Sequence, residues 1–377
     1  MKTVLFISNV NKASKDAYLS KEDYSVSTLV DMPSKIAASL GFNSLVGINR
    51  YYATTFNIEG IEYYNQLIFR NPFNFLEVKK GYKNVESIIK NRKIDLIFCC
   101  TPLGGYVGRK LGKKYHIPVI YQAHGFHFYK GAPLLNWLLY YPIEKKLAKY
   151  TDVLITINNE DYEIAQRKFK VKKKLMYIPG IGIDIDSIVS TKSDDEKLKK
   201  ELGISNDIFS ILSVGYINKN KNHQLVIRAM AMLKDSRIHY YIAGEGSEKE
   251  KLCHLAQKLG VADNVHFLGY RKDVLALYKA VDLFVLPSLR EGLPVSVMEA
   301  VCQKTMVIAS NIRGVNEIVD DCMLFKTNDV KKMSYLIKEC VNGEHKETIL
   351  SNFNRLNKYD IKIVSAQLKA LFTEMEI

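Results

Sequence analysis

With 377 residues the chain is too long for one hydrophobic core, and its 47% hydrophobic and 25% charged residues are typical of a globular protein. No apolar stretch reaches the ~20 residues that span a bilayer, and Lys2–Ser8 turns polar too soon for a signal peptide. Residues 1–185 hold 27 Lys and Arg against 15 Asp and Glu, a balance of +12, and the rest of the chain balances at +2. We therefore expect an anionic partner at the N-terminal half: nucleic acid, an acidic membrane surface or a diphosphate-bearing acceptor.

Short apolar runs alternate with helical patterns in both halves, which predicts parallel α/β sheets. The predicted strands of the first half are Val4–Ser8, Leu45–Ile48, Asp95–Cys100, Val119–Gln122, Val153–Ile157 and Leu175–Ile178. Those of the second half are Phe209–Val214, His239–Ala243, Val265–Leu268, Leu283–Leu286 and Met306–Ala309.

The breaker-rich segment Ile178–Asp184 predicts the boundary between two doubly wound domains. Ligands of such sheets bind at the carboxyl ends of the strands. Asp194–Leu202 predicts a charged helix that opens the second domain. The last predicted helix, Ile361–Glu374, fits either a return to the first domain after Tyr359-Asp360 or a cover for the second sheet.

Two patterns in the first half imitate metal sites. His124 and His127 have ligand spacing but follow a strand and have no Cys or carboxylate pattern beside them. Asp184 and Asp186 lie at the domain boundary, where a turn is the better interpretation because oxygen ligands alone do not make a cation site. We expect no metal. For His127 a core position and a functional one are equally open. The six Cys have no zinc-like or disulfide-like spacing, and a reducing cytoplasm fits them.

The segment Gly131–Tyr150 is apolar and aromatic, then basic. One interpretation is a helix that lies in a bilayer interface with its aromatic rings at headgroup depth, kinked at Pro142. The alternative is a core helix with a solvated basic end. The charge of the first half favours the membrane. The candidate contact residues are Phe126, Lys130, Trp137, Tyr140, Tyr141, Lys145 and Lys146.

Two acids eight positions apart, Glu291 and Glu299, follow the strand that ends at Leu286. Val295–Gln303 predicts a helix, with Pro294 at its first position. Its start offers amide groups to an anion, and the two carboxylates are at most ~12 Å apart, which is the span of a nucleotide-sugar. Carboxylates suit diols because each oxygen accepts a hydroxyl hydrogen. The expected anion site includes Arg290, Gly292, Leu293, Pro294 and Val295.

This stretch resembles the signature of the GT4 family of retaining glycosyltransferases, in which two Glu are separated by seven residues. The resemblance implies the GT-B fold: two Rossmann-like doubly wound domains facing across a cleft. It implies an acceptor-binding domain over residues 1–182, to which a helix at about 360–377 returns, and a nucleotide-sugar-binding domain over residues 183–359. Family members often have Gly-Gly after the first strand, but Ser8–Lys15 has none. Tyr18–Asp31 is a candidate acceptor loop.

The resemblance also assigns roles residue by residue. Family members place an Arg after the glycine that corresponds to Gly215, and a Lys five residues later, both on the donor diphosphate. Lys221 matches the Lys, but Tyr216 replaces the Arg, so Lys219, Arg290 or a helix start must supply the missing charge. The remaining matches are Gly244 beside the nucleotide, Tyr270 and Arg271 in the segment that reads the base, and His124 near the reacting sugar. Gly244–Ser247 also imitates a dinucleotide fingerprint, but its third glycine is missing.

Around Gly131–Tyr150 the chain resembles bacterial capsule and exopolysaccharide glycosyltransferases. The implied reaction moves a hexose or N-acetylhexosamine, with UDP as the expected nucleotide, to a polyprenyl-diphosphate-linked saccharide. The resemblance implies that the protein is cytoplasmic and binds peripherally to the inner face of the cell membrane, which is an anionic surface. The expected mechanism retains configuration and needs neither metal nor cofactor. In it Glu291 orients the sugar hydroxyls, and Glu299 binds the ribose.

Two alternatives to this function stay open. One is a GT-B sugar-nucleotide 2-epimerase, which shares the two-domain architecture. The other is a basic nucleic-acid-binding protein, which explains the charge but leaves Glu291 and Glu299 without a use. The chain also lacks a helix-turn-helix, zinc or RNP-like pattern, so we expect no nucleic acid as a partner.

Overall fold

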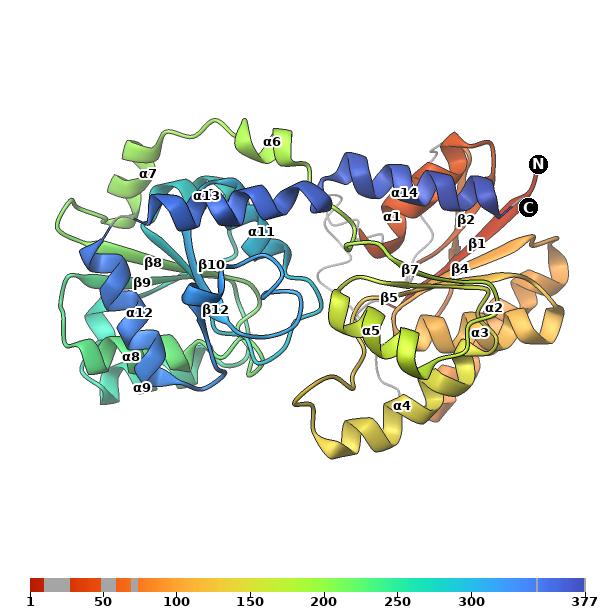
Figure 1. Cartoon of the computed structure of the whole chain (residues 1–377), viewed down its shortest axis with the longest axis horizontal. Coiled ribbons are helices and arrows are strands. Elements are labelled where there is room, and N and C mark those ends of the chain that lie inside the picture. The colour runs from red at the N-terminus through yellow and green to blue at the C-terminus, as the bar shows by residue number, and fades with distance from the viewer. Residues whose placement is uncertain (10–27, 49–58, 69–73, 344, 376–377) are drawn as a thin grey trace. The chain divides into compact units, whose positions relative to one another are not determined.

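The computed structural model describes residues 1–9, 28–48, 59–68, 74–343 and 345–375 (Figure 1). Val10–Lys15 of the first loop and most of the candidate acceptor loop lie outside these ranges. The chain divides into two compact units. The first is Met1–Gly182 with Ile361–Ile377, and the second is Ile183–Asp360. Each unit contains one parallel sheet with helices around it, which confirms the predicted α/β class.

The first sheet has the strand order β3-β2-β1-β4-β5-β6-β7. Ile61–Asn65 was not predicted, because this edge strand buries only two of its five residues and shows no continuous apolar run. The strands are β1 Thr3–Ile7, β2 Asn43–Ile48, β3 Ile61–Asn65, β4 Leu96–Cys100, β5 Val119–Ala123, β6 Val153–Thr156 and β7 Lys174–Tyr177.

The two faces of this sheet form separate cores. Leu5 and Ile7 of β1 pack on one face, and Val4 and Phe6 on the other, as the period of two dictates. The helices of the unit are α1 Thr28–Ser39, α2 Phe75–Asn91, α3 Pro102–Tyr115, α4 Leu134–Ala148, α5 Asn159–Lys168 and α14 Ile361–Glu374.

The C-terminal helix α14 packs on the first sheet. Its Phe372 ring lies 6.4 Å from the ring of Phe6 and 5.9 Å from that of Phe98. Val364, Leu368 and Leu371 are buried in the same core. The helix lies beside α1 (Figure 1).

The second sheet has the order β10-β9-β8-β11-β12-β13. The two-residue strand β13 was not predicted, since it is too short to show a pattern. The strands are β8 Phe209–Val214, β9 Ile238–Ala243, β10 Val265–Gly269, β11 Leu283–Leu286, β12 Met306–Ser310 and β13 Leu324–Phe325. The α-helices are α6 Ile185–Val189, α7 Asp195–Leu202, α8 Gln224–Leu233, α9 Lys249–Lys258, α10 Val274–Ala280, α11 Val295–Cys302, α12 Val330–Asn342 and α13 Lys346–Asn354. Short 3₁₀ helices lie at Ala262–Asn264, Asp321–Met323 and Arg355–Tyr359.

Each strand order has one point from which the chain winds outward in both directions. In the first sheet this point lies between β1 and β4, and in the second between β8 and β11. Strands β8 and β11 pair in parallel, with Ile211 opposite Leu283. Open α/β sheets bind ligands outside the carboxyl ends of the two strands at this switch point. The loops after Val214 and Leu286 are therefore where a site is expected in the second unit.

Candidate functional site in the second unit

The loops that follow β8 and β11 are joined by two hydrogen bonds. The Leu289 amide donates to the Asn220 carbonyl at 2.8 Å, and the Asn220 side-chain amide donates to the Arg290 carbonyl at 3.0 Å. These bonds fix the position of one loop against the other. The switch point of the second sheet is thus bordered by two coupled loops, one from each strand.

A lysine and a glutamate meet across these loops. Lys221 Nζ lies 3.0 Å from Glu291 Oε1, and each side chain is 18% exposed. The Lys221 amide donates to Asn218 Oδ1 at 3.0 Å, which holds the turn that presents the lysine. A partly exposed pair of this kind stabilises a fold by only about 1 kcal/mol or less. Its two charges are therefore available to a ligand: a cation for phosphate, and a carboxylate for hydroxyl groups.

Three glycines bring the surrounding backbone close together. A Cβ on Gly244, whose φ is 155°, would lie 2.0 Å from the Gly215 carbonyl oxygen. A Cβ on Gly314, whose φ is 73°, would lie 2.2 Å from the Gly292 carbonyl oxygen. These contacts leave no room for side chains, so backbone lines this edge of the sheet. Gly215 itself lies against the Lys221 side chain, since its Cβ would meet Cε at 3.0 Å.

If the site binds UDP as the resemblance implies, replacement of Gly314 by Ala is expected to displace the loop at Gly292 and to weaken this binding roughly 10–100-fold, because small displacements in a site have effects of this size. Gly260→Ala is the matched control, since its φ is 70° and nothing lies within 4 Å of the added Cβ. It imposes the same left-handed strain without a collision. UDP titration of both variants checks this, and equal affinity in the two would contradict it.

The start of α11 differs by one position from the prediction. Pro294 is the N-cap, with φ −81° and ψ 110°, and not the first helical residue. Its carbonyl accepts from Val297 at 3.2 Å and from Met298 at 3.4 Å, so the amides before Val297 find no acceptor within the helix. Arg313 Nε donates to the Glu291 carbonyl at 3.0 Å and fixes the backbone just before this helix start.

Glu299 lies on α11, and its carboxylate is held by one hydroxyl group. Tyr278 OH donates to Glu299 Oε2 at 3.1 Å, and burial raises the pKa of Glu299 above its usual value. Tyr278 is itself fully buried. Glu291 is paired and Glu299 is half-buried, so neither is the freely solvated acid of an ordinary surface helix.

The other predicted donor-site residues differ in their exposure and in their contacts. Tyr216 is 60% exposed, Tyr270 is 71% exposed, and Arg290 is exposed. Arg271 forms ion pairs with Asp273 at 2.6 Å and with Glu201 at 2.8 Å. Its hydrogen bond to Asp273 is the main reason that the pKa of Arg271 is raised. Because the Arg271 guanidinium is already paired with two carboxylates, we expect a ligand to contact the backbone of this segment and not the Arg271 side chain. Leu293 packs against the core, and Val295 is 39% exposed.

His124 follows β5 in the first unit. Its Nε2 is buried without a hydrogen-bond partner among the described residues, and burial lowers the pKa of His124 to about 4. The following Gly125 has a φ of 112°, which glycine adopts without strain. The His127 ring packs against Tyr140, with ring centroids 4.6 Å apart.

Because the pKa of His124 is lowered, the unfolded chain binds its proton more readily than the folded chain does. The stability contributed by neutral His124 is therefore present above pH 6.5 and is lost as the pH falls toward 4, by roughly 3 kcal/mol. His124→Gln should remove this part of the pH dependence, whereas the exposed His116→Asn should leave it. Trp137, the one tryptophan of the chain, reports unfolding of this unit by fluorescence. An unchanged pH slope in His124→Gln would contradict the assignment.

Several predictions for the first unit need correction. Phe126 is only 2% exposed and stacks on Phe128, so it forms part of the core and not of a surface. Trp137, Tyr140 and Tyr141 pack against the same core. Lys130, Lys145 and Lys146 are exposed, as a surface role requires. In the second unit, Asp184 is the N-cap of α6 and accepts from the Ser187 amide at 2.9 Å, and Asp186 lies in the first turn of this helix, so the predicted turn is the start of a short helix.

Sequence reasoning missed the support beneath the Lys221 loop. His223 Nδ1 lies 2.8 Å from the Tyr240 hydroxyl, which donates to Ser213 Oγ at 2.9 Å. This chain of hydrogen bonds joins the start of α8 to β9 and β8. Asn218 could have been found from its turn-forming type beside Lys221, but the pairing of His223 with Tyr240 had no local signal.

Two Rossmann-like parallel-sheet units, each with a switch point, are the architecture of the GT-B fold. HepE of Anabaena, solved in complex with UDP and glucose, has this fold: its TM-score is 0.75 at 19% identity, over 99% of this chain and 100% of that chain. Residues 50–187 match the family described as "Glycosyltransferase Family 4", and residues 194–356 match "Glycosyl transferases group 1".

Named relatives agree with this class. A putative glycosyltransferase of Bacillus subtilis, EpsD, is 36% identical over 258 residues, which are 67% of this chain and 68% of that protein. The UDP-Gal:alpha-D-GlcNAc-diphosphoundecaprenol alpha-1,3-galactosyltransferase of Escherichia coli is 27% identical over 79% of this chain and 80% of that protein. The chain belongs to glycosyltransferase family 4.

Proposed function

We propose that this glycosyltransferase moves a hexose or N-acetylhexosamine from a UDP-sugar to a polyprenyl-diphosphate-linked saccharide, with retention of configuration. The Escherichia coli relative supports both substrates, since its name gives a UDP-sugar and a diphosphoundecaprenol acceptor. The Lys221–Glu291 pair at the switch point is the observation that carries the proposal. The second unit binds the donor in this account, and the first unit binds the acceptor.

In the proposed mechanism the donor separates the Lys221–Glu291 pair. The diphosphate takes Lys221, and the sugar hydroxyls take the Glu291 carboxylate. Glu291 lies on one of the two coupled loops, and Arg313 holds its backbone carbonyl, so in this account its carboxylate is held in position before the sugar binds. In this account Glu299 accepts hydrogen bonds from the ribose hydroxyls, while Tyr278 holds its Oε2.

Charge develops on the diphosphate when the sugar leaves, and Lys221 together with the amides at the start of α11 stabilises it. A protein nucleophile is not required, because the acceptor hydroxyl attacks on the face from which the diphosphate leaves. With these groups supplying positive charge, the proposed reaction needs neither a metal nor a cofactor. The contact of His124 with the reacting sugar stays a prediction.

The reaction is proposed to take place at the inner face of the cell membrane, with the enzyme cytoplasmic and peripheral. No helix in the described ranges is long and apolar enough to cross a bilayer. The acceptor proposed here carries a lipid and a diphosphate, and the +12 balance of residues 1–185 suits both that anion and an anionic membrane surface.

Transfer can be tested by incubating the purified protein with a panel of UDP-, GDP- and ADP-sugars and a polyprenyl-diphosphate-linked acceptor. Mass spectrometry should show one added sugar with a UDP donor, and NMR of the product should show the anomeric configuration of the donor. A product of inverted configuration, or transfer from another nucleotide alone, would contradict the finer proposal.

Incubation with UDP-sugars alone separates this function from that of a sugar-nucleotide 2-epimerase. A transferase leaves the sugar configuration at C2 unchanged without an acceptor. Release of epimerised free sugar under these conditions would favour the alternative.

A further inference from the structure

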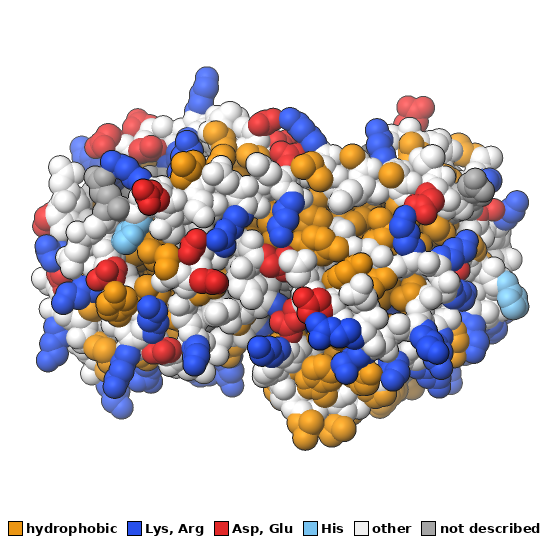
Figure 2. Space-filling model, viewed as in Figure 1, with side chains coloured by type: hydrophobic (Ala, Val, Ile, Leu, Met, Phe, Trp, Pro, Cys, Tyr) orange, Lys and Arg blue, Asp and Glu red, His pale blue; other side chains and the backbone are white. Residues whose placement is uncertain are grey.

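The N-terminal part of α4 presents a continuous apolar face to solvent. Figure 2 shows hydrophobic side chains gathered over this helix. The exposed fractions are 73% for Leu134, 62% for Leu135, 65% for Leu138, 45% for Leu139 and 48% for Ile143. Residues four apart lie in line along a helix, so Leu134 and Leu138 form one row, and Leu135, Leu139 and Ile143 form a second row beside it; the two rows are here called the α4 face.

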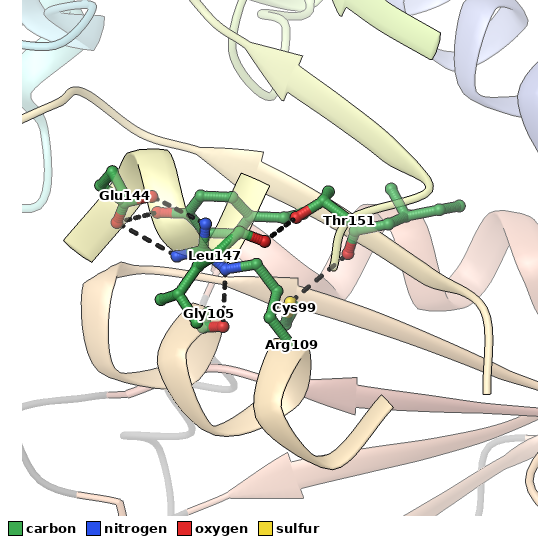
Figure 3. Close-up of polar contacts among 8 residues, drawn as sticks. Cys99, Gly105, Arg109, Glu144, Leu147 and Thr151 are labelled. Atoms are coloured by element: carbon green, nitrogen blue, oxygen red, sulfur yellow. Dashed lines mark hydrogen bonds and ion pairs between the residues drawn. The ribbon is translucent and has the colours of Figure 1, made fainter. Parts of the chain in front are cut away.

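The opposite side of α4 is locked into the core, so the α4 face cannot turn inward. Arg109 of α3 binds both oxygens of Glu144 of α4, at 2.7 and 3.1 Å (Figure 3). The Arg109 guanidinium lies 3.8 Å from the centroid of the Tyr121 ring on β5. Arg109 Nε also donates to the Gly105 carbonyl at 2.8 Å. The pair is buried and fixes the rotation of the helix about its own axis.

A surface helix that is apolar on its outward side exposes hydrocarbon that water disfavours, and five adjacent aliphatic side chains are more than scattered exposure. The outward residues carry no hydrogen-bonding groups on their side chains. The α4 face therefore fits a fluid, apolar partner that forms no specific hydrogen bonds with it. The hydrocarbon boundary of a bilayer is such a partner.

The charges around the face favour an anionic bilayer over a second copy of the chain. Lys145 and Lys146 are exposed and continue from Ile143 into the next turn of α4. The α4 face carries no carboxylate, so a second copy packed through the same face would offer these lysines no counter-charge. Anionic headgroups would instead meet the lysines while the leucines enter the layer beneath.

We propose that the α4 face inserts into the surface of an anionic bilayer and docks the enzyme there. This inference rests on the proposed function and names the surface that serves it. The loop that follows β5 leads directly into α4, so docking through α4 holds the end of this loop at the lipid surface. The aliphatic residues make the contact, and Trp137, Tyr140 and Tyr141 support the helix from its inner side.

Flotation with vesicles of phosphatidylcholine, with and without phosphatidylglycerol, tests the docking. The double variant L138S/L139S should lower the partition onto anionic vesicles by at least about tenfold. Leu350→Ser, a 57% exposed leucine on α13, is the matched control and should partition like the wild type. The double variant K145Q/K146Q should lose most of the preference for anionic over neutral vesicles.

The thermal shift produced by UDP separates this proposal from the proposed function. L138S/L139S should keep the full shift, because its changes lie in the other unit. Wild-type protein that does not float with anionic vesicles, or L138S/L139S that floats equally well, would overturn the docking. So would a wild-type dimer in solution that this double variant converts to a monomer, since the face would then bind a second copy. If UDP does not raise the melting temperature of the wild-type protein, that result would instead count against the proposed function.

Discussion

Glu291→Gln is expected to lower the turnover number of sugar transfer by more than about 100-fold while the fold stays intact. The change removes the charge that we propose orients the donor sugar, and loss of one positioned group in an active site typically has an effect of 10²–10³. Its ion pair with Lys221 is partly exposed, so the effect on the melting temperature should be small. Steady-state kinetics and thermal unfolding of the same preparation measure both effects.

The same variant should bind UDP at least as tightly as the wild type. In the free enzyme the Glu291 carboxylate competes with the diphosphate for Lys221, and the substitution removes this competition. Glu86→Gln is a suitable control, because it breaks the 2.6 Å pair of Glu86 with Lys114 in the other unit. Normal turnover in Glu291→Gln, or an equal loss in Glu86→Gln, would refute the role of Glu291.

Glu144→Leu is expected to destabilise the first unit by about 3–5 kcal/mol, because it leaves the buried Arg109 guanidinium without its carboxylate. The double variant R109M/E144L should recover most of this loss, since replacing both partners by apolar groups leaves no buried charge. Urea unfolding followed by Trp137 fluorescence measures it, because this tryptophan lies on α4 itself. If the double variant were as unstable as Glu144→Leu, the unpaired charge of Arg109 would not be the cause of the lost stability.

The sequence predicted the parts of the fold that have a local signal. The strands of both sheets except β3 and β13 were visible as apolar runs, because parallel strands are covered on both faces. The helix after Glu291 was visible as well, although Pro294 stands one position earlier than predicted. The pairing of Lys221 with Glu291 joins residues 70 positions apart, and only the strand order brings them together.

The orientation of α4 could not be derived from its sequence. The helix is apolar on nearly all sides at its N-terminal end, so periodicity does not tell its inner face from its outer face. The sequence favoured the aromatic residues as the outward group, and the structure places them inward. The reason is the ion pair of Arg109 with Glu144, two residues 35 positions apart that fix the rotation of the helix.

The affinity for UDP in Lys221→Met tests the account most directly, because the account places the diphosphate on Lys221. Isothermal titration calorimetry should show an affinity roughly 10–100-fold weaker than in the wild type, as expected for loss of a hydrogen-bonded charge. Lys338→Met, an exposed lysine on α12, should bind UDP like the wild type. Unchanged UDP affinity in Lys221→Met would contradict the proposed donor site.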